Sequence, residues 1–411
     1  MKERIIQFGE GNFLRGFCDY FIHKLNEKGL YDGKIVVVQP IANGMVDMLN
    51  DANCEYNLFL RGIENGEVVN EHTKITSISR GINPYENYAD YLALAKNPDM
   101  RFVISNTTEA GIEFIDTDKL TDAPPKAFPA KLTILLYERF KANLGGFVML
   151  SCELIDNNGD ELKACVMKYA KLWQLGEAFE AWIENENHFC NTLVDRIVTG
   201  YPRDEIKELT EKIGCEDKLI DTAEIFHLWV IAGNFENELP FNKAGYNIVW
   251  ADSVDLYKKR KVRILNGAHT SLVPYAMLKG FQTVGECMEN PEMKAYLKKC
   301  MFEEIIPTLD LPKAELESYA NSVLERFANP FIKHMLSSIA LNTVSKFRVR
   351  VMPSIIEYKK RFGKYPETLM TAFDAFYEFY KTDMANDTAE DMNFMKTHTK
   401  EEVFEEFCNA D

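Results

Sequence analysis

The sequence Phe8-Gly9-Glu10-Gly11-Asn12-Phe13-Leu14-Arg15-Gly16 follows directly on an apolar run, Ile5–Phe8, and leads into an amphipathic stretch, Phe17–Lys28. A strand, a glycine turn and a helix in this order are typical of dinucleotide-binding sheets, in which the turn lets backbone N–H groups approach a pyrophosphate. The glycine spacing departs from the usual Gly-x-Gly-x-x-Gly, and a plain turn is the alternative. The position at the first strand–helix junction favours the dinucleotide interpretation, so all nine residues are candidates for cofactor binding.

The first half of the chain alternates strand-like and helix-like segments. Runs rich in Val, Ile and Phe lie at Ile5–Phe8, Lys34–Gln39, Arg101–Ser105 and Gly146–Cys152. Longer amphipathic stretches such as Ala130–Asn143 separate them. This alternation predicts an α/β fold with a Rossmann-type, doubly wound parallel sheet. Within it, we expect Tyr56–Ile78 to form an antiparallel excursion.

From Val254 onward the pattern becomes helical. Helices are expected at Met293–Phe302, Leu316–Phe327, Ile332–Ser345, Ile355–Arg361 and Thr368–Lys381. We therefore predict a Rossmann-type dinucleotide-binding domain over residues 1–253. A mainly α-helical C-terminal domain, which would bind substrate and carry the catalytic residues, is predicted over residues 254–411.

Composition excludes several classes of partner. The 411 residues include 47 basic and 63 acidic side chains, a net charge of −16, which disfavours binding to nucleic acid or an anionic membrane. The nine cysteines form no Cys-x-x-Cys pair, as in reduced cytosolic proteins. The N-terminus lacks the apolar segment of a signal peptide, and no run is long enough to span a bilayer. We expect a cytoplasmic protein, for which monomer and dimer both remain open.

A cluster of small polar residues, Asn106-Thr107-Thr108-Glu109-Ala110-Gly111, follows the third strand-like run. Open α/β sheets bind ligands at this edge, so Thr107, Thr108 and Glu109 are further candidates for cofactor binding. An ordinary N-cap followed by a helix fits the same residues. Gln39-Pro40 stands where an acidic residue would contact the ribose, and this leaves NAD and NADP open.

The segment Tyr257–Thr270 packs five cations into six positions and then places polar residues in an apolar stretch. A solvent-exposed basic face, or a hairpin with a turn at Asn266-Gly267, would need no function. As a helix, the segment places Lys261, Asn266 and His269 within about 140° of one another. The interior glycine would cost that helix roughly 1 kcal/mol. Such breaks of local rules are commonest at functional sites.

The spacing Lys261-x4-Asn266-x2-His269 resembles the active-site signature of the mannitol dehydrogenase family, the polyol-specific long-chain dehydrogenases. Further landmarks stand in the family's order over most of the chain: Gly9–Gly16, Thr107–Gly111, Ser151-Cys152, Asn158-Gly159, Val194-Asp195-Arg196, Arg326-Phe327-x-Asn329-Pro330 and Ser345-Lys346. Phe226-His227-Leu228-Trp229 and the string Arg260–Thr270 are most similar to members of the family that act on a hexuronate, a sugar acid.

The resemblance implies an oxidoreductase with NAD as cofactor that transfers a hydride to the keto group of a sugar acid. Lys261 would be the acid/base, Asn266 would hold the developing alkoxide, and His269 would orient a substrate hydroxyl. A satisfied core histidine is the alternative for His269. No metal is expected, because the 7 histidines form no pair at ligand spacing with one another or with cysteine.

The sequence also departs from the family pattern. Glu153-Leu154 replaces the Asp-Asn pair of the polyol enzymes, and Ser338 stands where the family has a substrate-binding arginine. Lys346 is kept, and Arg348 and Arg350 follow it. These three cations, which suit a carboxylate, and Asn158 are the predicted substrate-binding residues. Exposed cations are the alternative for the two arginines. A sister uronate or polyol dehydrogenase and a non-catalytic dinucleotide-binding sensor are the rival functions.

Overall fold

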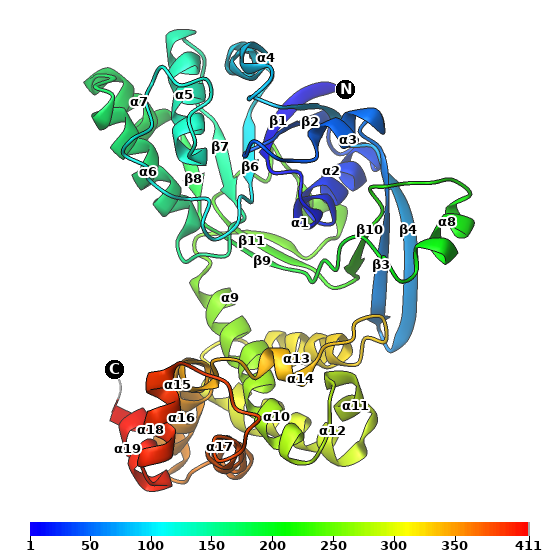
Figure 1. Ribbon diagram of the computed structural model, residues 1–411, viewed down its shortest axis with the longest axis vertical. Coiled ribbons are helices and arrows are strands. Elements are labelled where there is room, and N and C mark those ends of the chain that lie inside the picture. Colours follow the sequence, from blue (N-terminus) through cyan, green and yellow to red (C-terminus); the bar gives the residue numbers. More distant parts are fainter. Residues whose placement is uncertain (410–411) are drawn as a thin grey trace. The chain divides into compact units, whose positions relative to one another are not determined.

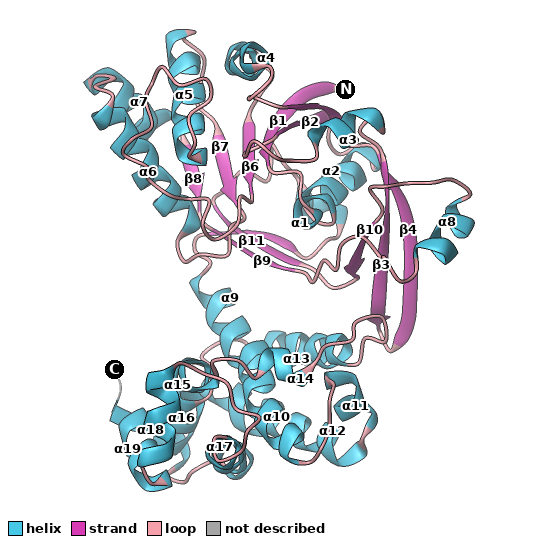
Figure 2. Cartoon of the chain, viewed as in Figure 1, coloured by secondary structure: helices cyan, strands magenta, loops and turns pink. Residues whose placement is uncertain are grey.

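The computed structural model describes residues 1–409, which fold as two compact units. Residues 1–61 and 70–254 form the first unit, and residues 62–69 with the described chain from 255 onward form the second. Strands are concentrated in the first unit, and helices make up most of the second (Figure 2). The predicted fold class, a Rossmann-type sheet followed by helices, is thus confirmed. The domain limits 1–253 and 254–411 stay a prediction.

The first unit is built on a six-stranded sheet in which all neighbouring strands are parallel (Figure 1). Its order is β5-β2-β1-β6-β7-β8, with the bounds β1 Lys2–Phe8, β2 Gly33–Val38, β5 Ile78–Ile82, β6 Phe102–Ser105, β7 Val148–Ser151 and β8 His188–Cys190. The chain reaches one edge through β2 and β5 and then crosses back to β6. The winding therefore reverses between β1 and β6, and ligands of doubly wound sheets bind at the carboxyl ends beside such a reversal.

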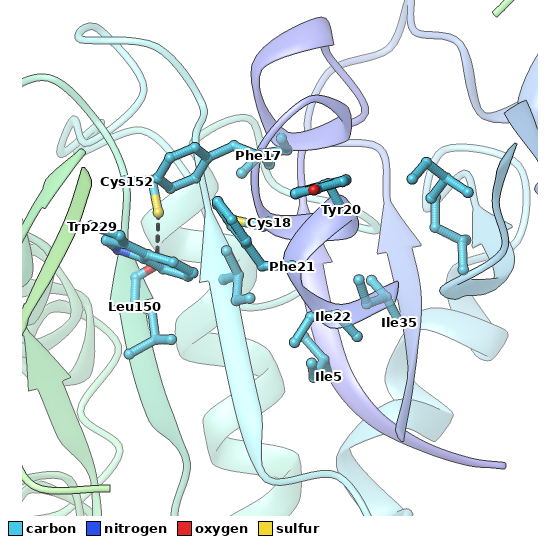
Figure 3. Packing of buried hydrophobic residues seen from close by; sticks show 14 of the residues in the cluster. Ile5, Phe17, Cys18, Tyr20, Phe21, Ile22, Ile35, Leu150, Cys152 and Trp229 are labelled. Carbon is cyan, nitrogen blue, oxygen red and sulfur yellow. Dashed lines mark hydrogen bonds between the residues drawn. The ribbon is translucent and has the colours of Figure 1, made fainter. Parts of the chain in front are cut away.

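The two faces of the sheet bury alternate residues of the same strands. Ile5 and Ile35 pack with helix α2 (Cys18–Glu27), as Figure 3 shows from close by. Ile6 and Val36 belong to the core on the opposite face, which includes residues of α5 (Phe128–Lys141) and α6 (Asn158–Leu172). Burial on both faces explains why the central strands are continuous apolar runs. The remaining helices of this unit are α1 Asn12–Arg15, α3 Val46–Asp51, α4 Tyr88–Ala93, α7 Glu177–Glu186 and α8 Ile206–Ile213.

Two small sheets complete the strands. One has the order β10-β3-β4 and the other β12-β11-β9, with the bounds β3 Tyr56–Glu64, β4 Glu67–Ile75, β9 Thr192–Asp195, β10 Asp221–Glu224, β11 Leu228–Ala232 and β12 Ile248–Ala251. Asn65 and Gly66 join β3 to β4 with φ of 53° and 83°, the positive values that a two-residue type I′ hairpin requires. The antiparallel excursion predicted at Tyr56–Ile78 is confirmed. Its tip, residues 62–69, groups with the second unit.

The second unit is helical. Its α-helices are α9 Asp255–Arg260, α10 Gly267–Leu278, α11 Val284–Glu289, α12 Pro291–Lys298, α13 Lys313–Phe327, α14 Leu336–Ile339, α15 Thr343–Arg350, α16 Met352–Phe362, α17 Glu367–Phe379, α18 Ala389–Thr397 and α19 Lys400–Asn409. Two π-helical segments extend them, Lys261–Asn266 between α9 and α10 and Lys299–Ile305 after α12. Among residues 1–409, no helix is both long and apolar enough to cross a bilayer.

One predicted helix is wrong. The stretch Ile332–Ser345 is divided, with α14 and the beginning of α15 separated by Asn342, whose φ of 54° lies in the left-handed region. A helix cannot continue through that conformation. The other helices predicted in the second half are confirmed within a few residues at their ends, and Met293–Phe302 runs from α12 into its π-helical extension.

Candidate functional site

The glycine turn lies at the carboxyl end of β1, where the winding of the sheet reverses. Gly9 has φ of +119°, a conformation that side chains rarely adopt. A Cβ at this position would lie 2.9 Å from the carbonyl oxygen of Asn106 and 3.1 Å from Leu14 Cδ1. Glycine therefore lets the ends of β1 and β6 approach each other, which makes a backbone cradle of the kind that fits a pyrophosphate.

Several side chains of the turn are used inside the protein. Phe8 and Leu14 lie in the core, and Arg15 is only 2% exposed. The Arg15 guanidinium donates three hydrogen bonds, to Glu10 O at 3.2 Å, Leu219 O at 2.5 Å and Asn12 Oδ1 at 2.6 Å. The side chains of Phe8, Leu14 and Arg15 therefore shape the turn from within, and cofactor binding by the nine residues stays a prediction that concerns their backbone.

The loop after β2, residues 40–45, is held by two buried side chains. Gln39 donates to two carbonyls of the loop at 2.9 and 3.1 Å, and Glu10 accepts from the N–H of Met45 at 3.1 Å. Burial raises the pKa of Glu10. The loop sequence Pro-Ile-Ala-Asn-Gly-Met contains no charged residue. It thus offers neither a carboxylate for the ribose hydroxyls nor a cation for a 2′-phosphate.

One buried carboxylate ties the ends of β6 and β7 together. Glu153 is 1% exposed and accepts from Ser105 Oγ at 3.1 Å, from Thr107 N at 3.0 Å and from Thr107 Oγ1 at 3.1 Å. Burial raises the pKa of Glu153. Thr108 follows with φ of +70°, which is unusual for a β-branched residue. Residues 106–127 contain no helix, so the N-cap alternative for this cluster is wrong, and Glu109 is exposed.

The substrate contact predicted for Asn158 needs correction. Its buried side chain donates to Glu153 O and Thr192 O at 3.0 and 3.1 Å, and accepts from the N–H groups of Thr192 and Gly159 at 2.9 and 3.0 Å. Asn158 therefore fastens the start of α6 to β9. Leu154, which stands where polyol enzymes have an asparagine, is 64% exposed and offers no polar atom in its place.

In the second unit, Lys261–Asn266 is π-helical and continues into α10. The hairpin alternative at Asn266-Gly267 is therefore wrong. In a π-helical turn residue i bonds to residue i+5, which brings Lys261 and Asn266 to the same side, and His269 follows three residues later on that side. The segment is thus π-helical over Lys261–Asn266, not α-helical as expected, and the joint role of the three residues stays a prediction. π-Helical turns of this kind are frequent at functional sites.

The interior glycine of this helix has a packing reason. A Cβ on Gly267 would lie 3.1 Å from the carbonyl oxygen of Arg350. Glycine therefore allows α10 and α15 to pack closely, and this packing offsets its low helix propensity.

The basic run before this helix is not a single exposed face. Arg260 is buried, with its guanidinium 4.5 Å from the centre of the Tyr319 ring. Arg263 is also buried and donates to Ser354 Oγ at 2.9 Å and to Thr308 Oγ1 at 3.3 Å. Burial lowers the pKa of Arg263 to about 10. The arginines of the run therefore stabilise the helical unit, while Lys259 is exposed.

His269 lies among basic groups. Its ring stacks on Phe327 with centroids 4.0 Å apart and meets the ring of His334 edge-on at 5.2 Å. The Nε2 atom of His269 is buried and has no hydrogen-bond partner in the described chain. Burial brings the pKa of His269 well below its usual range, and four basic groups lower it further: His334, Arg326, Arg350 and Lys346. The orphaned nitrogen does not fit a satisfied core histidine and is suited to a substrate hydroxyl.

Helix α15 separates the three predicted carboxylate ligands. Lys346 and Arg350 are one helical turn apart, and the positive charges of both lower the pKa of His269. Arg348 instead donates to Glu406 at 2.7 Å and lies 4.5 Å from the centre of the Phe407 ring. The prediction for Arg348 is thus corrected, since its side chain packs against α19. Arg350 is partly buried, which lowers its pKa, and it has no hydrogen bond or ion pair with any residue of 1–409.

Two members of the basic group, Arg326 and His334, were not among the predicted substrate-binding residues. Arg326 lies at the end of α13, and His334 lies in the loop that follows. Both come from segments distant in sequence from His269, so no spacing rule links them to it. The string Arg326-Phe327-x-Asn329-Pro330 was the one signal that marked this region.

The described residues 1–409 contain no group of three or more His, Cys, Asp or Glu side chains that could hold a metal ion. Chemistry without a metal stays a prediction. All nine cysteines are free thiols.

Comparison with known proteins covers both units. Residues 3–243 match the model of the mannitol dehydrogenase Rossmann domain, and residues 253–406 match that of the mannitol dehydrogenase C-terminal domain. The chain is 49% identical over 393 residues to altronate oxidoreductase of Escherichia coli O6:K15:H31, covering 94% of this chain and 81% of the relative. It is 49% identical over 386 residues to altronate oxidoreductase of Yersinia enterocolitica, covering 92% and 80%.

Solved structures share the fold. A D-sorbitol dehydrogenase in substrate-free form aligns with a TM-score of 0.83 at 22% identity, over 99% of this chain and 92% of its own. Mannitol 2-dehydrogenase of Pseudomonas fluorescens, in a ternary complex with NAD and D-mannitol, aligns with a TM-score of 0.71 at 23% identity, over 96% and 84%. Since both family models match and together span most of its length, the chain belongs to the mannitol dehydrogenase family of oxidoreductases.

Proposed function

We propose that the protein is an NAD-dependent altronate oxidoreductase, or tagaturonate reductase, which interconverts D-tagaturonate and D-altronate by hydride transfer. The observation that carries the proposal is the basic group around His269, with Arg326, Lys346 and Arg350 gathered in a chain of net charge −16. A sugar acid has a carboxylate that such cations can bind, and a polyol has none. The 49% identity to altronate oxidoreductases supports the same substrate class.

The first unit has the features that NAD requires. The glycine turn at Gly9 gives a pyrophosphate close access to backbone N–H groups, and Thr107 stands at the neighbouring strand end. NAD bound there would supply the hydride carrier. The loop 40–45 offers no cation to pair with a 2′-phosphate, and the Glu10 carboxyl lies against it. We therefore expect NADH to be preferred to NADPH.

The second unit would supply the proton. In the reduction, a hydride adds to the keto carbon while the ammonium of Lys261 donates a proton to the keto oxygen, which leaves a neutral amine. Asn266 would donate a hydrogen bond to this oxygen as negative charge develops on it. The amide of Asn266 is available, because it makes no hydrogen bond within the described part of the chain. Nε2 of His269 would orient a neighbouring hydroxyl.

We also propose a cytoplasmic location, which nine free thiols in the chain support. The substrate partner would be a sugar acid, and neither nucleic acid nor a membrane is expected as a partner because of the acidic net charge.

Oxidation of NADH with a panel of tagaturonate, fructuronate, tagatose and fructose tests the function. We expect the highest kcat/KM with tagaturonate, much lower values with the two uncharged ketoses, and poorer activity with NADPH. A preference for fructuronate would identify a sister uronate enzyme, and a preference for fructose a mannitol-type enzyme. Binding of NADH with no turnover of any of them would favour the non-catalytic sensor. Each of these three outcomes contradicts the proposal.

A further inference from the structure

The loop between α13 and α14 presents a second histidine, His334, beside the basic group. The backbone of His334 is fixed on both sides: its N–H donates to Ile332 O at 3.0 Å, and its carbonyl accepts from Val284 N at 3.0 Å. The next N–H but one, of Leu336, donates to Gln282 O at 2.9 Å. The loop is therefore anchored to the segment that starts α11, and the imidazole is held in place by its backbone.

The ring of His334 is left without a hydrogen bond to any of the residues 1–409. It is partly buried and meets the ring of His269 edge-on, with centroids 5.2 Å apart and an interplanar angle of 86°. Its ring nitrogens are not among the buried atoms that lack a partner, so they remain open to solvent or to a ligand. The two imidazoles thus form a pair with unused hydrogen-bonding capacity.

The charges around the pair have one sign. The charge of Arg326 lowers the pKa of both histidines, and the charges of Arg350 and Lys346 of α15 lower the pKa of His269. Asp387 faces Lys346 and also accepts hydrogen bonds from Tyr380 and from the N–H of Val344. The charges that lower the pKa values of the two histidines come from basic groups. Such a concentration of positive charge favours an anionic ligand.

His269 and His334 are placed for different parts of one substrate. His269 follows Lys261 and Asn266 on one continuous helical segment, which carries the residues proposed to act on the keto group. His334 comes from another segment, beside Arg326. In tagaturonate, hydroxylated carbons separate the keto group from the carboxylate, so the two groups need ligands from different parts of the fold.

We propose that His334 is a specificity-determining residue that donates a hydrogen bond to the carboxylate of the sugar acid. This inference rests on the proposed function and names a residue that would distinguish the acid from an uncharged ketose.

The assignment has a consequence for pH dependence. Burial, and then the charge of Arg326, lowers the pKa of His334 and so favours the neutral imidazole in the free protein. An arriving carboxylate favours the charged form, and binding is then accompanied by proton uptake. The KM for tagaturonate should therefore fall, relative to that for tagatose, as the pH is lowered from 8 to 6. Taking this ratio cancels the titration of groups that serve both substrates.

The variant His334→Asn keeps a hydrogen-bonding side chain but cannot become charged. Because a neutral amide binds a carboxylate less strongly than an imidazolium does, we expect its KM for tagaturonate to rise about tenfold, with the KM for tagatose close to that of the parent. The pH dependence of the ratio should disappear. His398→Asn, an exposed histidine at the end of α18, is the matched control and should behave like the parent.

The outcomes separate this inference from the proposed function. A parent protein that does not prefer tagaturonate contradicts the proposed function itself. A preference that survives in His334→Asn, or an equal loss with both substrates, overturns only the role of His334. The parent protein also tests the assignment without any variant. If the ratio of its KM values for tagaturonate and tagatose does not change with pH, the assignment is overturned.

Discussion

The glycine turn of the first unit and the basic group around His269 in the second unit use their polar side chains in opposite ways. Around the turn, the side chains of Arg15 and Glu153 form hydrogen bonds with other groups of the protein. Around His269, Nε2 of that residue, the amide of Asn266 and the guanidinium of Arg350 have no partner in the described chain. The first site is a shape made by backbone, which suits a cofactor common to many enzymes. The second includes these three side chains with unpaired hydrogen-bonding groups, which suits a specific substrate.

The largest effect should come from Lys261→Ala, which separates the two sites. If Lys261 is the acid/base, kcat should fall by about 10²- to 10⁴-fold, while the Kd for NADH stays unchanged because the glycine turn is intact. Stopped-flow turnover and fluorescence titration of NADH measure the two quantities. Lys259→Ala, an exposed lysine of the same basic run, is the control and should leave both unchanged. Activity of Lys261→Ala within a few fold of the parent would show that the catalytic assignment is wrong.

A pair of variants two residues apart tests the side-chain character of the second site. Arg350→Ala should lose about ten- to a hundredfold in kcat/KM with tagaturonate, the cost of one hydrogen bond to a charged group, and little with tagatose. Arg348→Ala removes the same charge from the other side of α15, where it pairs with Glu406. It should lower the melting temperature more than the activity. Equal loss of uronate activity in both variants would contradict the division of α15 into two faces.

The sequence predicts the regular parts of the first unit because the apolar strand-like runs and the amphipathic stretches between them indicate the same fold. The apolar run Lys34–Gln39 corresponds to β2, Gly33–Val38, and its residues are buried on both faces of the sheet. The break of the predicted helix at Asn342 has no such signal, because apolar residues continue at helical spacing across it. The left-handed conformation is one of several that the neighbouring residues allow Asn342 to adopt. The packing of the second unit determines which of them it adopts.

The same limit applies to the candidate site. The spacing of Lys261, Asn266 and His269 was enough to group them, although a π-helical turn and not an α-helix brings them together. The positions of Arg348 and Arg350 in the sequence could not distinguish their roles. The orientation of α15 determines that Arg350 lies near His269 and that Arg348 pairs with Glu406. The position of His334 beside His269 depends on contacts between segments distant in sequence, which a single sequence does not reveal.

The backbone character of the first site is tested by two glycines of one turn. Gly9→Ala should weaken NADH binding about tenfold and also destabilise the unit, because an Ala at φ of +119° is strained by about 1–3 kcal/mol and its Cβ meets the carbonyl of Asn106. Gly11→Ala places its Cβ in open space at φ of −66° and should keep the melting temperature of the parent. A Gly9→Ala protein with the stability and NADH affinity of the parent would refute the requirement for glycine.

Beneath the same turn lies a buried carboxyl, Asp19, whose hydrogen bonds are incomplete. Tyr56 Oη donates to Asp19 Oδ2 at 3.2 Å, but Asp19 Oδ1 and Oε1 of the neighbouring Gln7 are buried acceptors without a donor. Burial raises the pKa of Asp19 from 3.8 to about 7. Gln7 lies beside this carboxyl and donates through Nε2 to the carbonyl of Gly9 at 3.0 Å. Gln7 thus connects Asp19 to the turn.

The smallest expected effect is therefore on the stability of the first unit with pH. Because the pKa of Asp19 is higher in the folded state, folding takes up a proton between about pH 4 and 7, and this stabilisation is lost as the pH rises through 7. Asp19→Asn carries the donor permanently and should lose less melting temperature between pH 5 and 8 than the parent, by about 2–4 °C for each 1 kcal/mol. Asp221, whose pKa burial also raises to about 7, keeps part of the slope in the variant. The exposed Asp116→Asn should retain the whole slope. An identical slope in Asp19→Asn and the parent would mean that Asp19 is already ionised in the folded protein, and the turn at Gly9 would then be held by its backbone geometry alone.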